Sequence, residues 1–140
     1  MGTSYLQRRG QLQTYFDRTA VEAWKRLTSD APVSCIRATV RAGRDRMRNT
    51  LLGWLPADLS GCRLLDAGCG NGRYSYWASR YGGRVIGVDL TQAVDAAFQN
   101  TRDVESIGIV QGDLFRLPFR PETFDLAFSI GVLMHTGDAR

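Results

Sequence analysis

A glycine-rich segment contains the residues best suited to bind a ligand: Asp66-Ala-Gly68-Cys-Gly70-Asn-Gly72. Closely spaced glycines let a chain turn sharply and let a ligand lie directly against bare backbone. The helix expected after Gly72 would present free amide N–H groups and the positive end of its dipole to such a ligand. The segment therefore predicts a cofactor site, although similar loops also occur as ordinary tight turns between a strand and a helix.

Two further acidic residues follow the next two predicted strands. Asp89 ends the segment RVIGVD, where a carboxylate can accept hydrogen bonds from both ribose hydroxyls of a nucleoside. Asp113 follows the next apolar segment, in Gln111-Gly-Asp113-Leu114. Taken singly, each aspartate could equally be a capping or turn residue. Three acids after three successive strands favour nucleoside binding.

The elements that must position these acids alternate between strand and helix. The sequence predicts four short apolar strands, at Arg63–Ala67, Arg84–Asp89, Ile107–Gln111 and Phe124–Ile130. It predicts helices over 73–81 and from a Thr91 cap through Asn100, the second with Val94, Ala97 and Phe98 facing inward. Alternating strands and helices of this kind indicate an α/β fold with a parallel sheet and helices on both faces.

The first third of the chain is predicted to be helical. One apolar pattern runs from Tyr15 through Trp24 to Leu27, and a second helix would begin at Asp30-Ala-Pro32 and end near Pro56. We therefore expect a helical arm or lid over residues 1–57 and a separate ligand-binding domain over residues 58–140.

Charge is uneven between these two parts. The net charge of the chain is +4, with +5 in residues 1–60 and −1 in residues 61–140. Four arginines of the second helix share one stripe at helical spacing: Arg37, Arg41, Arg44 and Arg48. The stripe could attract an anionic substrate or could form an ordinary solvated face. Aromatic residues are not interleaved with it, which argues against a nucleic acid as the partner.

Composition excludes several other classes of protein. No apolar run approaches the 18 residues of a transmembrane helix, and the start of the chain lacks the apolar region of a secretory signal. The three cysteines form no CxxC pair, and the single histidine argues against a zinc site, so no bound metal is expected. Reduced thiols in a cytoplasmic protein are the expectation.

The spacing DxGxGxG resembles the first motif of class I S-adenosylmethionine-dependent methyltransferases, and the resemblance covers residues 62–137. It implies a Rossmann-like fold with S-adenosylmethionine as the cofactor. By this resemblance Asp66 reaches the cofactor's amino group, Asp89 its ribose, and Asp113 its adenine amino group. It also implies four further contacts: Leu90 and Leu114 sandwich the adenine, and the backbone of Ser129 and Ile130 meets the methionine part. An NAD-dependent oxidoreductase is the alternative. Its dinucleotide-binding pattern GxGxxG requires glycine at position 73, where the chain has Arg73.

The N-terminal half has a narrower resemblance. Its segments Tyr15-Phe-Asp-Arg-Thr-Ala, Gly43-Arg-Asp-Arg-Met and Leu51-Leu-Gly-Trp-Leu-Pro resemble the N-terminal arm of magnesium-protoporphyrin O-methyltransferases, which esterify a porphyrin propionate in chlorophyll and bacteriochlorophyll synthesis. After Gly72 the chain is more similar to generic small-molecule methyltransferases, so it has the pattern of a mosaic. The resemblance implies a small anionic or tetrapyrrole acceptor, with a different small-molecule acceptor as the alternative.

Two residues are candidates for catalysis. A carboxylate acceptor is already ionised at neutral pH and needs no strong base, whereas a hydroxyl or nitrogen acceptor can require one. His135 follows the fourth predicted strand and is the single histidine of the sequence, the residue type that titrates near neutral pH. Tyr15, on the N-terminal arm, could orient the acceptor. A capping or packing role is the alternative for His135, and a place in the helix core is the alternative for Tyr15.

The predicted sheet is incomplete. Class I methyltransferases have seven strands in the order 3-2-1-4-5-7-6, whereas four are predicted here, in the order 3-2-1-4, with strands 5–7 missing. The apolar segment Phe124–Ile130 would then lie at an open edge, where self-association through strand pairing is expected. A non-catalytic, truncated cofactor-binding module is therefore a second hypothesis for this chain.

Overall fold

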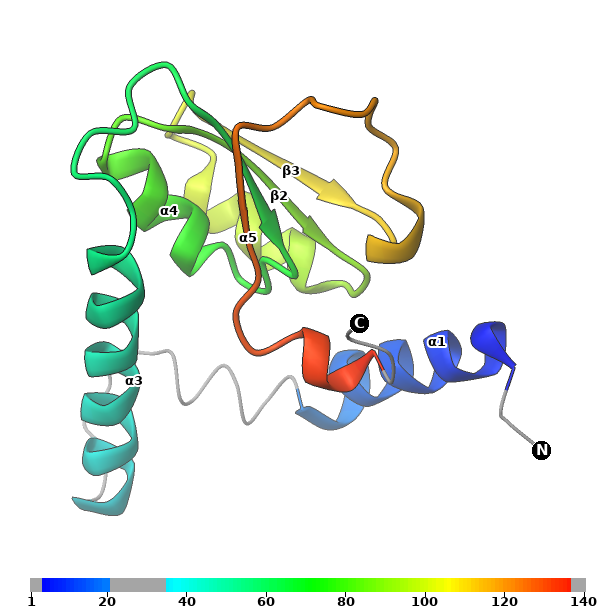
Figure 1. Ribbon diagram of the computed structural model, residues 1–140. Helices are drawn as coiled ribbons and strands as arrows, with labels where there is room; N and C mark the ends of the chain where they lie inside the picture. Colours follow the sequence, from blue (N-terminus) through cyan, green and yellow to red (C-terminus); the bar gives the residue numbers. More distant parts are fainter. Residues whose placement is uncertain (1–3, 21–34, 137–140) are drawn as a thin grey trace. The chain divides into compact units, whose positions relative to one another are not determined.

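The computed structural model describes residues 4–20 and 35–136 (Figure 1). The predicted features at Trp24, at Leu27 and at Asp30–Pro32 lie outside the described residues. The chain divides into two compact units, Met1–Pro56 and Ala57–Arg140, and each is described by itself.

The first unit is helical. It contains the helix α1 (Tyr5–Thr14), the π-helical segment η1 (Tyr15–Ala20) and the long helix α3 (Cys35–Gly53). Helix α1 begins well before the predicted apolar pattern, because Ser4 caps it. The Ser4 hydroxyl accepts from the Gln7 amide and the Gln7 side chain accepts from the Ser4 amide, so each satisfies an amide that a helix start leaves open.

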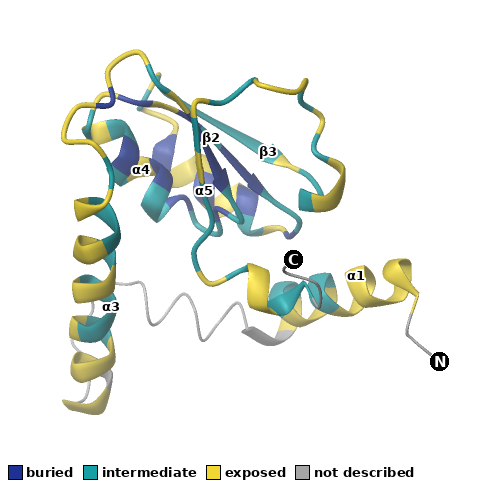
Figure 2. Ribbon diagram, in the orientation of Figure 1, coloured by how far each residue is buried: buried dark blue, intermediate teal, exposed yellow. Residues whose placement is uncertain are grey.

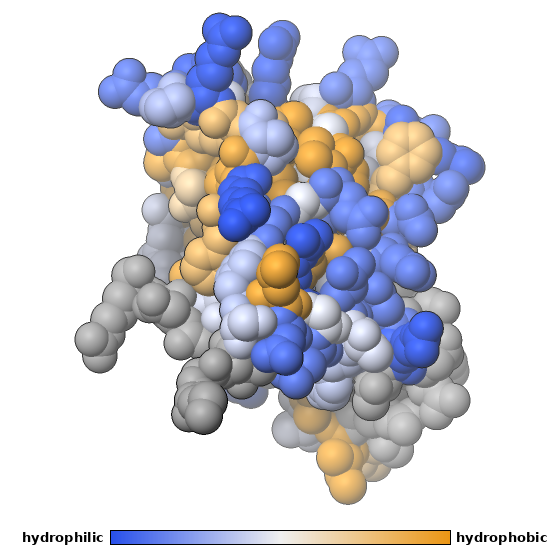
Figure 3. Space-filling model, turned by 90° about the vertical axis from the view of Figure 1, so that its right-hand side faces the viewer, coloured by the Kyte–Doolittle hydropathy of each residue, from blue (hydrophilic) through white to orange (hydrophobic). Residues whose placement is uncertain are grey.

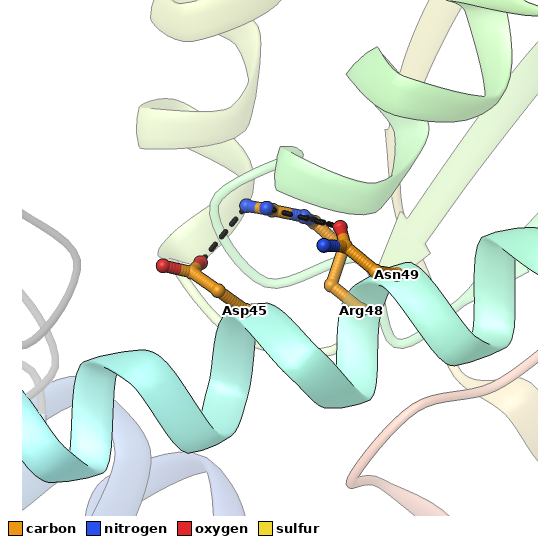
Figure 4. A network of polar contacts seen from close by, with 3 residues as sticks. All are labelled: Asp45, Arg48 and Asn49. Atoms are coloured by element: carbon orange, nitrogen blue, oxygen red, sulfur yellow. Dashed lines mark hydrogen bonds and ion pairs between the residues drawn. The ribbon is translucent and has the colours of Figure 1, made fainter.

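Helix α3 has exposed apolar side chains and three half-buried arginines. Several of its apolar side chains are at the surface, with Ile36 80% and Met47 47% exposed (Figure 2). Arg41, Arg44 and Arg48 are each half-buried. The Arg48 guanidinium lies 2.9 Å from an Asp45 carboxylate oxygen and also donates to the Asn49 side chain (Figure 4). These bonds hold the Arg48 side chain along α3.

The second unit is built on a four-stranded parallel sheet. Its strands are β1 (Arg63–Ala67), β2 (Arg84–Asp89), β3 (Ile107–Gln111) and β4 (Leu126–Phe128). Their order, β3-β2-β1-β4, confirms the predicted order 3-2-1-4. The register pairs Asp66 with Gly87 and Asp89 with Gln111, so the carboxyl ends of β1, β2 and β3 lie next to one another.

Strand β4 is shorter than the predicted Phe124–Ile130. It pairs with β1 only from Leu126 to Phe128. The pairing ends at Phe128 because β1 turns away at Ala67 into the glycine loop. Beyond this point the Ser129 hydroxyl donates to the Ala67 carbonyl at 2.7 Å. Among the described residues β4 is an edge strand, and self-association through that edge stays a prediction.

Helices α4 (Arg73–Arg80) and α5 (Ala93–Thr101) cover one face of the sheet. They contact each other, and both contact β2 and β3. Of the two faces on which helices were expected, the described residues of this unit therefore place helices on one. The buried apolar residues of the core come from the strands, the two helices and the adjoining loops: Leu59, Leu64, Leu65, Cys69, Ala78, Val85, Val88, Val94 and Ala97.

The prediction that Phe98 faces inward is wrong. Its side chain is 57% exposed. The buried side of α5 is instead formed by Val94, Ala97 and Thr101, whose spacing of three and four residues follows the helical repeat, and Phe98 lies outside that stripe.

Two single-turn 3₁₀ helices follow β3 and β4. They are η2 (Leu114–Arg116) and η3 (Leu133–His135). Both carry exposed apolar side chains, including Phe115 and Met134. Figure 3 shows hydrophobic residues lying between hydrophilic ones on one face of the molecule. Of the helices that the structure describes, none combines the length and apolar character needed to cross a membrane.

Candidate cofactor-binding site

The glycine loop between β1 and α4 is folded back onto β2. The amides of Gly68 and Cys69 both donate to the Val88 carbonyl, at 2.7 and 3.0 Å. Gly68 has a φ of 88°, and a Cβ there would lie 2.2 Å from a Val132 methyl carbon. Only glycine fits this position, because any side chain would be strained and would collide with the segment after β4.

Gly72, at the other end of the loop, fits against helix α5. It has a φ of 81°, and a Cβ there would lie 3.2 Å from both Ala97 and Thr101. The Asn100 side chain also donates to the Asn71 carbonyl at 3.0 Å. Helix α5 therefore supports the second half of the loop.

Gly70, at the centre of the loop, faces open space. Its φ is 52°, and nothing lies within 4 Å of a Cβ placed there. Its amide donates to the Asp89 carboxylate oxygen Oδ2 at 2.9 Å. The structure thus joins two predicted site residues directly and leaves free backbone surface beside them, as a ligand lying on the loop would require.

The segment after β2 orients Asp89. The second carboxylate oxygen, Oδ1, accepts from the Thr91 amide at 3.0 Å and from the Thr91 hydroxyl at 2.7 Å. Leu90, between them, is half-buried, and its carbonyl accepts from the Gln111 side chain at 3.2 Å. The last bond joins the ends of β2 and β3 across the sheet edge.

Asp113 caps the 3₁₀ helix η2. Its carboxylate accepts from the Phe115 amide at 3.0 Å, so the capping role considered from the sequence is present. Asp113 and Leu114 are both half-buried, as is Leu90. The two leucines follow neighbouring strand ends, where the resemblance implied that they would flank a planar group.

Asp66 lies in the core below the loop. It is 1% exposed and accepts from the Ser75 hydroxyl of α4 at 2.7 Å. Burial raises the pKa of Asp66 to about 7, the nearby Asp89 charge adds to the rise, and the Ser75 bond opposes it. Burial likewise raises the pKa of the Cys69 thiol far above its usual range, so the thiol stays protonated.

Sequence reasoning missed Ser75 and gave Thr91 only the role of a helix cap. A signal existed for Ser75, since it is a small polar residue among the aromatic residues of the first turn of α4, on the side that faces the sheet. For Thr91 the signal was its position two residues after Asp89, from which a hydroxyl can bond back to the acid.

The remaining predicted residues lie in two places. Ser129 and Ile130 are half-buried directly after β4, with Ser129 bonded to the end of β1. His135 is half-buried in η3, and its amide donates to the Val132 carbonyl at 2.9 Å, which places it one turn beyond the residue that contacts Gly68. Tyr15 belongs to the first unit, where its ring packs edge-on against Phe16.

Comparisons with known proteins point to one family. A family model described as a methyltransferase domain matches residues 65–140. The chain is 48% identical over 99 residues to the magnesium-protoporphyrin O-methyltransferase of Rhodobacter capsulatus, covering 69% of this chain and 44% of the relative. It is 29% identical over 131 residues to the Synechocystis protein of the same name, covering 89% of this chain and 56% of that relative.

A solved structure matches as well. The crystal structure of magnesium protoporphyrin IX methyltransferase from Synechocystis PCC 6803 with bound SAH (S-adenosylhomocysteine) has a TM-score of 0.80 at 27% identity, over 91% of this chain and 60% of that one. The chain spans about half the length of the curated relatives that it matches.

Proposed function

Because the chain belongs to the methyltransferase domain family, we propose that it binds S-adenosylmethionine and serves in the transfer of its methyl group to an oxygen of a small-molecule acceptor. One observation carries the proposal: the glycine loop, Asp89 and Asp113 meet at the carboxyl edge of three adjacent parallel strands. Ligands of open parallel sheets bind at this edge.

The residues present fit this cofactor. Gly70 offers bare backbone with open space, and Asp89, which accepts from its amide, can also accept from a ribose hydroxyl. Asp113 can accept from the adenine amino group, with Leu90 and Leu114 as apolar walls. The backbone at Ser129 and Ile130 borders the place of the methionine part.

In this proposal Asp66 does not contact the cofactor directly. Its carboxylate is buried under the loop and bonded to Ser75, so it acts on the cofactor's amino group through the loop or through water. An ammonium group above the loop would favour ionised Asp66, because an opposite charge stabilises a carboxylate.

When bound, S-adenosylmethionine supplies a methyl group on a good leaving group, the sulfonium. The protein then has to align the acceptor with that methyl group and exclude water. An acceptor carboxylate needs no proton removed, because it is ionised at neutral pH. His135, near the loop, is our candidate to orient the acceptor or to remove a proton from a hydroxyl acceptor.

The proposed acceptor is a magnesium-protoporphyrin propionate. The two magnesium-protoporphyrin O-methyltransferases that the chain resembles support this choice, as does the similar structure with SAH. In this proposal residues 1–57 form an arm that closes over the acceptor, with Tyr15 as a contact residue. The three free cysteines fit a reducing compartment, and we place the protein in the cytoplasm.

Calorimetric titration with S-adenosylhomocysteine tests cofactor binding. We expect saturable binding that Asp89→Ala weakens by about 10- to 100-fold, since hydrogen bonds to a charged group contribute roughly 1.5–3 kcal/mol. Asp103→Ala is the matched control, because that side chain is 94% exposed and should leave the affinity unchanged. Binding of NAD in place of S-adenosylhomocysteine would refute the proposal.

Transfer of a labelled methyl group tests the acceptor separately. With labelled S-adenosylmethionine, we expect label in magnesium-protoporphyrin and none in its propionate diester. Cofactor binding without transfer to any acceptor would favour the hypothesis of a non-catalytic binding module over that of an enzyme.

A further inference from the structure

The Asp89 carboxylate is held at both oxygens before any ligand is considered. Oδ2 accepts from the Gly70 amide, and Oδ1 accepts twice from Thr91, through its amide and its hydroxyl. A carboxylate has about four lone-pair positions, so three donors leave one, on Oδ2, for an incoming hydroxyl. The orientation of this carboxylate decides whether that position faces the ligand.

We propose that Thr91 is a positioning residue for the cofactor: its hydroxyl holds the Asp89 carboxylate in the orientation that accepts a ribose hydroxyl. The inference rests on the proposed function, since it assumes that Asp89 meets the ribose. Thr91 itself acts through Asp89 and does not touch the ligand.

A second hydrogen bond fixes the direction in which the Thr91 hydroxyl donates. The same oxygen accepts from the Ala93 amide at 3.3 Å, at the start of α5. That amide is one of those that a helix start leaves without a partner inside the helix. Because one lone pair of the hydroxyl faces Ala93, its proton is free to point at Asp89, and the 2.7 Å distance is that of a strong bond to a charged acceptor.

Thr91 also connects the acid to the far end of the glycine loop. It is 7% exposed, so its hydroxyl does not exchange freely between the carboxylate and bulk water. Helix α5, whose start it binds, seats Gly72 through Ala97 and Thr101. Asp89 is therefore tied to one part of the loop directly, at Gly70, and to another through Thr91 and α5.

Affinities for two ligands distinguish positioning from support of the fold. Thr91→Val removes the hydroxyl and keeps the shape, and Thr91→Ser keeps the hydroxyl. Each variant would be titrated with S-adenosylhomocysteine and with its 2′,3′-dideoxy analogue. Thr101→Val is the matched control, since Thr101 is also buried in this region, at 2% exposure, and its hydroxyl donates to the Ala97 carbonyl, away from Asp89.

We expect Thr91→Val to weaken S-adenosylhomocysteine binding about tenfold and to change binding of the dideoxy analogue less than about twofold. Thr91→Ser should bind both ligands with wild-type affinity. Thr101→Val should change the affinities for the two ligands by the same factor. If the valine variant does not fold, Thr91→Cys gives the same comparison, because its S–H is a weak donor.

Two results would overturn the inference in different ways. Equal weakening of both ligands by Thr91→Val, or no weakening, would show that Thr91 does not position Asp89, while the proposed function stands. If wild type binds neither ligand, or binds both equally well, the ribose assignment of Asp89 fails and the role of Thr91 fails with it.

Discussion

The buried acid Asp66 makes stability depend on pH in an unusual direction, and Asp66→Asn tests this. The substitution keeps the shape of the side chain and an oxygen that can accept from Ser75, but it removes the ionisation. In wild type, burial raises the pKa of Asp66 from 3.8 to about 7. The folded protein therefore binds this proton more tightly than the unfolded chain does.

The sign and the size of the effect follow from that difference. Between pH 4 and 7 the unfolded chain has lost the proton that the folded state still holds, so the free energy of unfolding falls as the pH rises. A shift of about three units, at 1.36 kcal/mol each, gives a loss of about 4 kcal/mol, complete somewhat above pH 7. This is a large share of the roughly 5–15 kcal/mol that stabilises a typical domain.

Urea unfolding at a series of pH values from 4 to 8.5, followed by circular dichroism, measures the effect. We expect wild-type stability to decline across this range and the Asp66→Asn curve to be flatter, so that the variant is the more stable protein above pH 7. Asp103→Asn, at a 94% exposed side chain, is the control and should follow wild type. Hydrogen bonds from Ser60 and Arg63 lower the pKa values of Asp58 and Asp125. These two acids therefore make the free energy of unfolding rise with pH, but only below this pH range.

Parallel curves for wild type and Asp66→Asn would refute the reasoning, because the carboxylate would then be ionised at little cost in the folded state. A rise in wild-type stability with pH that Asp66→Asn abolishes would show that the pKa is lowered. Ser75→Ala gives an independent check: it removes the bond that favours the ionised form, so the decline should extend to higher pH.

Three further predictions concern the glycines and the thiols. Gly68→Ala should destabilise the protein by roughly 2 kcal/mol or more in urea unfolding, because the new Cβ would collide with Val132 at a φ of 88°, and a neutral result would contradict the close approach. Gly43→Ala, inside α3 with nothing within 4 Å, should instead stabilise by up to about 1 kcal/mol. A thiol reagent at pH 8 should label the exposed Cys35 in the native state and reach the buried Cys69 only after unfolding, and rapid labelling of Cys69 would contradict its burial.

The sheet could be predicted from sequence because its signals are local. Short apolar segments separated by glycines and a helical repeat predict the bounds of β1, β2 and β3. The strand order was predicted from the resemblance to class I methyltransferases. The length of β4 could not be predicted, since it depends on where its partner β1 leaves the sheet at Ala67. Phe98 was misplaced because an apolar residue on a short helix can lie beside the buried stripe as easily as in it.

The site was predictable as a set of acids but not as a network. Spacing brings Asp89 and Asp113 to the same sheet edge, and the structure shows them there. It does not reveal that Asp66 is fully buried against Ser75, or that Thr91 fixes Asp89, because both depend on the packing of α4 and α5 on the sheet. Motif spacing predicts the candidate residues, whereas the contacts that each one makes depend on tertiary packing.

A crystal structure of the chain with S-adenosylhomocysteine tests the central claim most directly. The account predicts a ribose hydroxyl at the Asp89 carboxylate, the adenine between Leu90 and Leu114 with its amino group at Asp113, and the ligand lying over Gly70. A ligand bound elsewhere, or with its ribose away from Asp89, would contradict the proposed site.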